Sequence, residues 1–189
     1  YHYASEPHDC LVNDKLDYLK CKENVTFIID KADSIFVEHF NIYSTLLTAW
    51  HKVCQDFDKG LLRNIVANET ELRTYFITTI KTIYPLDFRI EVWQDRYITI
   101  DGKSFKPDAQ YSHEIVIEMK SFFRNQQYTL YKANKLIMEN LQKMSSYSKE
   151  FKIGLLFCLS DKFTASQMKP SNYPNPGFVF RMLIHSNCE

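Results

Sequence analysis

An aspartate, a glutamate and a lysine lie close together in the middle of the chain, in the segment Lys106–Lys120, KPDAQYSHEIVIEMK. Its last six residues alternate between two sets of side chains, which predicts a strand with Glu118 and Lys120 on the same face. Asp108 belongs to the preceding strand, whose end is predicted at Lys106–Gln110. Two carboxylates can hold a hard divalent cation such as Mg²⁺, and a lysine beside them can orient a water or stabilise charge on a phosphate. We therefore predict Asp108, Glu118 and Lys120 as catalytic residues.

Together with Pro107, these residues resemble the PD-(D/E)xK nuclease superfamily. The resemblance covers roughly Asn68 to His185. It implies an α/β chain with a restriction-endonuclease-like αβββαβ core, in which helices flank a mixed central sheet. It also implies a nuclease that uses Mg²⁺ or Mn²⁺ and acts on nucleic acid, with DNA favoured over RNA.

A helix is predicted from Asn68 to Tyr84, because Asn68 is a good N-cap and acidic residues follow it in the first turn. The expected buried face is Leu72, Tyr75, Phe76, Thr79 and Ile80. In the superfamily, a glutamate on the first core helix often reaches the metal, which implies Glu69 as a ligand beside Asp108 and Glu118. Glu71 is the second choice. The pattern Asn-Glu-x-x-x-Arg is also similar to the helix that opens the nuclease domain in motor subunits of type I restriction enzymes. The alternative is that both glutamates are ordinary first-turn acids.

A second helix is predicted from Gln126 to Ser146. Gln127 and Tyr131, four residues apart, resemble the Gln-x-x-x-Tyr pattern that follows the lysine in RecB-like members. This resemblance implies that the two residues bind substrate or support the active site. The alternative is two exposed polar residues on a helix.

The remaining core elements are predicted to be strands. Alternating segments Leu86–Trp93 and Arg96–Ile100 are followed by Asp101-Gly102, a hairpin signal, and the meander continues into the Asp108 segment. The apolar run Lys152–Leu159 predicts a buried strand that is parallel to the Glu118 strand across the second helix. Phe178–Ile184 predicts a last strand.

Residues 1–60 are predicted to form an N-terminal helical extension packed on the core, and residues 61–189 the nuclease-like domain. Within the extension we expect a short helix around Val12–Cys21, a strand at Val25–Asp30 and a long amphipathic helix at Asp33–Asp58. The apolar stripe of that helix contains Phe36, Phe40, Tyr43, Leu47, Trp50 and Cys54. It either packs on the domain or receives a protein partner.

The composition limits the class of protein. Lysine and arginine equal the acids in number, 23 each, which argues against a strongly basic, nonspecific surface for nucleic acid but is compatible with a locally basic contact surface. Five cysteines without a CxxC pair favour a reducing, intracellular location, cytoplasmic or nuclear. No apolar run is long enough to span a bilayer. Because the chain opens on Tyr1, a lost targeting segment is an open alternative.

A second function class is consistent with the same sequence. The chain could be a catalytically inactive nuclease-fold domain that serves as a nucleic-acid or protein-binding module of a larger protein or effector. The zero net charge and the long N-terminal helix favour this alternative. The complete set of Asp108, Glu118 and Lys120 favours the enzyme, because a decayed site is expected to have lost one of the three.

Overall fold

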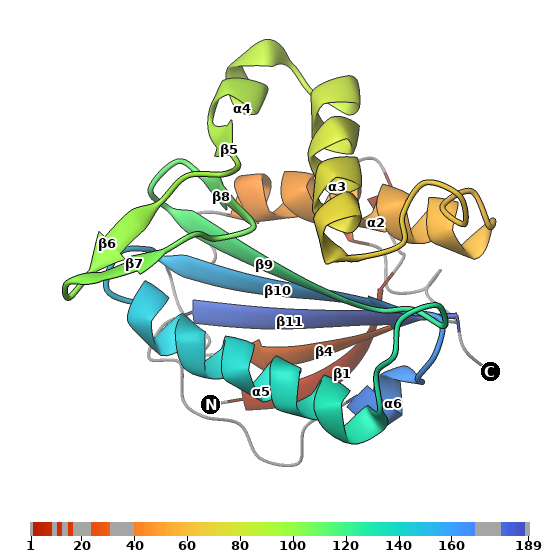
Figure 1. Ribbon diagram of the computed structural model, residues 1–189. Coiled ribbons are helices and arrows are strands. Elements are labelled where there is room, and N and C mark those ends of the chain that lie inside the picture. The colour runs from red at the N-terminus through yellow and green to blue at the C-terminus, as the bar shows by residue number, and fades with distance from the viewer. Residues whose placement is uncertain are drawn as a thin grey trace.

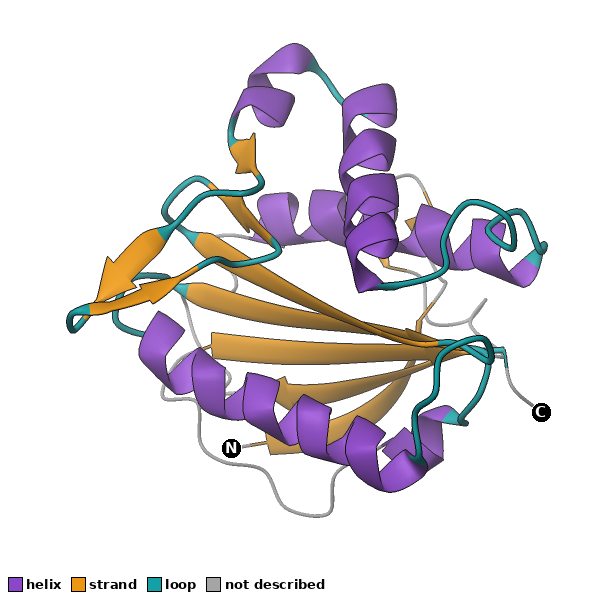
Figure 2. Cartoon of the chain, viewed as in Figure 1, coloured by secondary structure: helices purple, strands orange, loops and turns teal. Residues whose placement is uncertain are grey.

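A computed structural model describes residues 2–8, 11–12, 15–16, 24–30, 40–168 and 179–187 of the chain, with side chains described for residues 42–168 and 180–187. It is a mixed α/β structure in which helices cover both faces of a central sheet (Figure 1 and Figure 2). This agrees with the α/β class that the sequence predicts.

The central sheet has five strands in the order β11-β10-β9-β8-β5. β9 and β11 are both parallel to β10, whereas β8 runs antiparallel to β9 and to β5. The strands are β5 (Val92–Trp93), β8 (Ala109–Tyr111), β9 (Ile115–Phe122), β10 (Ile153–Ser160) and β11 (Val179–Ser186). The predicted parallel pairing of the Glu118 strand with the strand after the second helix is therefore confirmed.

Two N-terminal strands extend the structure beyond β11. β1 (His2–His8) pairs antiparallel with β4 (Asn24–Asp30), and β4 lies alongside β11 in Figure 1. The strand predicted at Val25–Asp30 is thus confirmed. The helix predicted around Val12–Cys21 is wrong where it is described, because β2 (Leu11–Val12) and β3 (Lys15–Leu16) pair there as strands, and its other residues lie outside the described ones.

Four of the helices flank the sheet. α2 (Phe40–Asp58) and α3 (Glu69–Ile83) lie on one face, and α5 (Leu130–Tyr147) and α6 (Ala165–Met168) lie on the other (Figure 1). Trp50 of α2 stacks on Phe157 of β10, with ring centroids 4.7 Å apart. The α2 stripe is buried at Tyr43, Leu47, Trp50 and Cys54, so these side chains pack on the sheet. Residues 33–39 of the helix predicted at Asp33–Asp58 lie outside the described residues.

The β9 strand separates two cores. Ile115, Ile117 and Met119 belong to the core beneath α2 and α3, whereas Val116 and Phe122 belong to the core beneath α5. This alternation is the one that the sequence predicts for the strand. It places the Glu118 side chain on the face of β9 that is directed toward α5, together with Val116 and Phe122.

The segment between α3 and β8 differs most from the prediction. The strand expected at Leu86–Trp93 is instead α4 (Leu86–Ile90) followed by the short β5, and Pro85 precedes this helix, where its fixed φ suits a helix start. Leu86 and Ile90 are exposed, so the alternation that suggested a strand is not a pattern of burial. The hairpin is confirmed: β6 (Ile98–Ile100) and β7 (Lys103–Phe105) pair across Asp101-Gly102, both with positive φ, as a separate two-stranded sheet.

None of the helices in the described residues carries an apolar stretch of the length that a bilayer crossing requires.

Candidate active site

The site lies where β8 stops pairing with β9. The ladder runs from Tyr111 opposite Ile115 to Ala109 opposite Ile117 and does not continue. Pro107 has no N–H to give to a sheet, which favours an end of pairing at this point. Asp108 takes over from the ladder, because its Oδ2 accepts a hydrogen bond from the Met119 N–H at 2.8 Å. The Asp108 carboxylate is thereby fixed against the open edge of β9, beside Glu118.

Glu118 is a buried acid with partners from α5. Its side chain is only 4% exposed. The Tyr147 hydroxyl donates to Glu118 Oε1 at 2.6 Å, and Lys143 Nζ lies 3.7 Å from the same oxygen. The two α5 residues are four apart, so they project from one side of the helix. Tyr147 and Lys143 therefore determine how the Glu118 carboxyl group is oriented.

The environment of Glu118 disfavours its negative charge. Burial raises the pKa of Glu118 to about 8, and the charge of the neighbouring Asp108 and a side-chain hydrogen bond with it add to this effect. Lys143 and the Tyr147 hydroxyl act in the opposite direction. Burial and the same carboxylate also raise the pKa of the Tyr147 phenol, which keeps it protonated and able to donate.

Lys120 points to the beginning of α3. Its Nζ lies 2.8 Å from Glu69 Oε2, and the two side chains are 18% and 33% exposed. The Lys120 pKa is raised: burial lowers it, but the charge and hydrogen bond of Glu69, followed by the charges of Asp108 and Glu118, outweigh burial. Burial raises the pKa of Glu69 against the opposing effect of Lys120.

The cap of α3 decides which glutamate faces the site. Asn68 Oδ1 accepts a hydrogen bond from the Glu71 N–H at 2.9 Å, and Asn68 Nδ2 donates to Glu71 Oε1 at 3.0 Å. These two bonds hold the Glu71 side chain at the cap. Glu69 is left to reach Lys120, so the structure brings the first choice to the cluster and not the second.

The side chains gathered here suit a hard cation. Asp108 and Glu118 are oxygen ligands that lie close together, since the charge of Asp108 makes ionisation of Glu118 less favourable, and a cation bound by both would offset that repulsion. Among the described residues, no three His, Cys, Asp or Glu side chains are already grouped to hold a metal ion. At the edge of β9, the third carboxylate, Glu69, is paired with Lys120 and does not point to Asp108 and Glu118.

Gln127 and Tyr131 are placed differently from the prediction. α5 begins at Leu130, and the Thr129 hydroxyl caps it by accepting from the Lys132 N–H, so Gln127 precedes the helix and does not share a face with Tyr131. Tyr131 is 79% exposed. It lies about 24 Å along the helix axis from Tyr147, at about 1.5 Å per residue. The α5 residues that contact the acids are at the opposite end of the helix.

Sequence reasoning missed Tyr147 and gave Lys143 no role at the acids. The available signal was their spacing of four residues on the helix after the lysine strand. The predicted helix ended at Ser146, one residue too early to include Tyr147, which belongs to α5.

Comparisons of the chain with protein-family models, with curated proteins and with solved structures give no match. Its function is therefore inferred from the arrangement of its own side chains.

Proposed function

We propose that this protein is a divalent-metal-dependent nuclease of the PD-(D/E)xK type that hydrolyses phosphodiester bonds in nucleic acid, with DNA favoured over RNA. One observation carries the proposal. Asp108 and Glu118 meet at the open edge of β9, and the Lys120 amine lies beside them with Glu69 from α3. Residues from three separate elements of the chain thus supply two acids, an amine and a third carboxylate to one place.

Asp108 and Glu118 are the residues that would hold Mg²⁺ or Mn²⁺, with Glu69 as the third. When bound, such an ion lowers the pKa of a coordinated water and offsets negative charge on a phosphate. Ionisation of Glu118 is unfavourable in the metal-free site, because its carboxyl group is buried next to Asp108. Loss of the Glu118 proton therefore accompanies metal binding.

Lys120 and Tyr147 have separate tasks in this proposal. The Lys120 ammonium, at present paired with Glu69, is the group that positions a water or stabilises charge that develops on the phosphate. Tyr147 holds the Glu118 carboxyl group in place through its 2.6 Å hydrogen bond to Oε1. Asp108 is oriented by a backbone N–H, so its position depends on the end of the β8–β9 ladder.

The order of elements supports a restriction-endonuclease-like core. α3 is followed by antiparallel strands that lead into β9, then by α5 and the parallel β10. Glu118 lies on β9, Asp108 directly precedes β8, and the additional glutamate begins the preceding helix, which agrees with the superfamily resemblance. The RecB-like Gln-x-x-x-Tyr feature gains no support, because Tyr131 is far from Glu118 along α5.

The test is cleavage of plasmid DNA, single-stranded DNA and RNA in Mg²⁺, in Mn²⁺ and in EDTA. We expect metal-dependent degradation by the wild type and its loss in Asp108→Asn, Glu118→Gln and Lys120→Met. Glu139→Gln and Lys103→Met are matched controls, because both side chains are exposed and outside the cluster. Failure to cut any substrate in either metal contradicts the proposal, as does full activity in Lys120→Met.

One observation favours the binding-module alternative. The Glu69–Lys120 ion pair satisfies the amine and a carboxylate that the enzyme would need. If the site is inactive, this pair is structural. Nucleic acid that is bound but left uncut in both metals, with no effect of Asp108→Asn on binding, identifies the module.

A further inference from the structure

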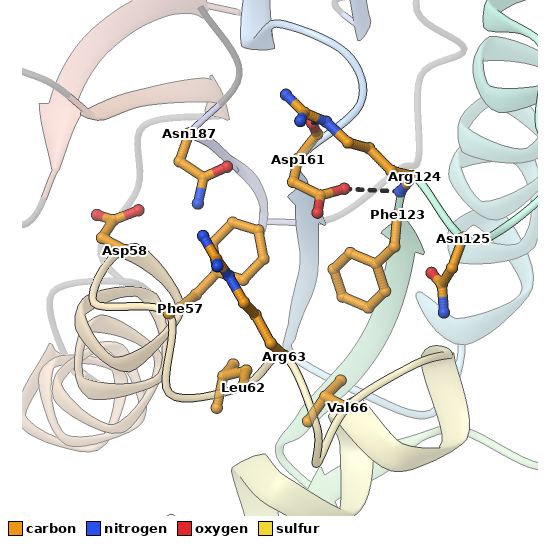
Figure 3. A pocket seen from close by; sticks show the side chains of 11 residues that line it. Phe57, Asp58, Leu62, Arg63, Val66, Phe123, Arg124, Asn125, Asp161 and Asn187 are labelled. Atoms are coloured by element: carbon orange, nitrogen blue, oxygen red, sulfur yellow. Dashed lines mark hydrogen bonds between the residues drawn. The ribbon is translucent and has the colours of Figure 1, made fainter.

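A cavity of about 470 Å³ lies at the carboxyl ends of the three parallel strands, outside the acidic cluster. Phe123 follows β9, Asp161 follows β10 and Asn187 follows β11, and all three line the cavity (Figure 3). The connection between α2 and α3 forms the opposite wall with Leu62 and Val66. Ligands of open α/β sheets bind outside the carboxyl ends of the strands, and the volume falls within the roughly 300–1,000 Å³ of small-molecule sites.

Two acids, Asp58 and Asp161, and two arginines, Arg63 and Arg124, line the cavity, and each acid has a partner on one carboxylate oxygen. His185 Nε2 lies 2.8 Å from Asp58 Oδ1, and Asp161 accepts from the Arg124 N–H at 2.7 Å. The Arg124 Nε donates to the Asp161 carbonyl at 3.0 Å. This bond fixes the Arg124 side chain and leaves its two terminal nitrogens available to a ligand. Within the part of the chain whose side chains are described, Arg63 forms no hydrogen bond or ion pair. Arg63 and the terminal nitrogens of Arg124 are therefore the groups of the lining that can bind an anion.

The lining also contains apolar and amide groups. The Phe57 and Phe123 rings lie with centroids 5.8 Å apart and form one side, and Asn125 and Asn187 bring side-chain amides that both donate and accept. Figure 3 shows Arg63 extending from the α2–α3 connection into the cavity, toward the side of Asp58 and Asn187. An anion joined to a flat ring with hydrogen-bonding edges is the ligand that matches this combination.

The cavity is close to the acidic cluster along the chain. Val66 precedes Glu69 by three residues, and Phe123 follows Lys120 by three, so each is within about 10 Å of extended chain from a member of the cluster. Asn125 Nδ2 donates to the Ala67 carbonyl at 3.5 Å, which joins the two walls beside this point. A nucleic-acid strand that has one phosphate at Lys120 can therefore place an adjacent nucleotide in the cavity.

We infer that this cavity binds one unpaired nucleotide of the substrate strand, next to the phosphate that is cut, with Arg63 on its phosphate. The inference rests on the proposed function for its substrate class, and it makes that class more specific. A base must leave its pair to enter a cavity of this size. The protein therefore prefers single-stranded nucleic acid, or an unpaired end, over a continuous duplex.

The test measures binding with the full chain in EDTA, so that no cleavage is needed. Fluorescence anisotropy follows a labelled single-stranded oligothymidylate and its duplex with oligoadenylate. We expect the single strand to bind more tightly and Arg63→Ala to weaken its binding by about tenfold, as the loss of one charge-assisted contact implies. Lys59→Ala is the matched control, because Lys59 is an exposed neighbour of equal charge that does not line the cavity. We expect it to stay within about twofold of the wild type, since one exposed charge contributes only a general term.

A second measurement separates the cavity from general attraction to a polyanion. Thymidine 5′-monophosphate and thymidine are titrated into the protein, with chemical shifts of the Asn187 and Asn125 amides as the readout. Saturable shifts with the monophosphate, reduced in Arg63→Ala and weaker with thymidine, support the inference. Equal losses of oligonucleotide binding in Arg63→Ala and Lys59→Ala overturn it, as do unshifted Asn187 amides. Cleavage by a protein whose Arg63→Ala variant binds normally ends this inference alone, whereas Arg63-dependent binding without cleavage ends only the proposed function.

Discussion

The Tyr147 hydroxyl donates a 2.6 Å hydrogen bond to Glu118 Oε1, although the two residues are 29 positions apart. Tyr147 is in the last turn of α5 and Glu118 in the middle of β9. The contact joins the helix that follows the lysine strand to the buried acid of the site. It makes Tyr147 a positioning residue, because it acts on the reaction only through Glu118.

Tyr147→Phe removes this bond and little volume. We expect kcat for DNA cleavage to fall on the order of tenfold with KM nearly unchanged, because the carboxyl group loses a fixed orientation and the substrate loses no contact. Steady-state kinetics on a single-stranded substrate measures both constants. Tyr97→Phe removes an exposed hydroxyl and serves as the control. A wild-type kcat in Tyr147→Phe would show that the hydrogen bond has no part in the reaction.

The Glu69–Lys120 ion pair is tested by a double-mutant cycle. The variants are Glu69→Gln, Lys120→Met and the double variant, measured by urea unfolding in EDTA. We expect a coupling free energy on the order of 1 kcal/mol, because the pair is partly buried and its atoms are 2.8 Å apart. Glu71→Gln replaces Glu69→Gln in a control cycle with Lys120→Met and should give no coupling. Equal coupling for both glutamates contradicts the assignment of Glu69 to the site.

The N-cap of α3 leads to a prediction about the stability of the protein. Asn68→Ala removes the side-chain oxygen that accepts from the Glu71 N–H, so the free energy of unfolding should fall by about 1 kcal/mol. Asn68→Ser keeps a side-chain oxygen that can accept from the Glu71 N–H, adds no charge beside Glu71 Oε1, and should stay near the wild type. Thermal unfolding of the three proteins at one pH makes the comparison. A loss of equal size in both variants would mean that the side-chain amide N–H, which donates to Glu71 Oε1, contributes more to stability than the cap.

The parts of the fold that sequence predicts well are those with local signals. Asn68 marks the start of α3, and Asp101-Gly102 forms the two-residue hairpin turn. The alternation in β9 gives its two buried faces. In each case the information lies within a few residues, because caps, turns and burial periods are local properties. The proximity of Asp108 and Glu118 follows from the same signals, since Asp108 directly precedes β8, which pairs antiparallel with the strand of Glu118.

The remainder depends on contacts between distant segments. The α4 segment has an apolar alternation that would suit a strand, but Leu86 and Ile90 find no core to bury them and the chain forms a helix after Pro85. Tyr147 meets Glu118 only because α5 crosses back over the sheet toward the start of β10. The helix predicted from Gln126 included Gln127, whereas α5 is capped by Thr129 and begins at Leu130.

The raised pKa of Glu118 predicts how stability changes with pH in the absence of metal. Its ordinary pKa is 4.5, and in the folded protein burial and Asp108 raise it to about 8. Between these values the folded protein retains a proton that the unfolded chain has lost. The free energy of unfolding should therefore fall as pH rises from about 4.5 to about 8, by a few kcal/mol, and then level off. Urea unfolding in EDTA at several pH values in this range measures the slope.

Glu118→Gln isolates this contribution, because the amide has nearly the same shape and does not titrate. The difference in unfolding free energy between the variant and the wild type should increase in favour of the variant from pH 5 to pH 8. Glu139→Gln, on the exposed face of α5, should run parallel to the wild type at every pH. Mg²⁺ should stabilise the wild type more at pH 8 than at pH 5.5, because fewer protons have to leave the acids when the ion binds. Curves for Glu118→Gln and the wild type that stay parallel across this range would mean that Glu118 is already ionised in the folded protein. The description of Glu118 as a buried acid that keeps its proton beside Asp108 would then be wrong.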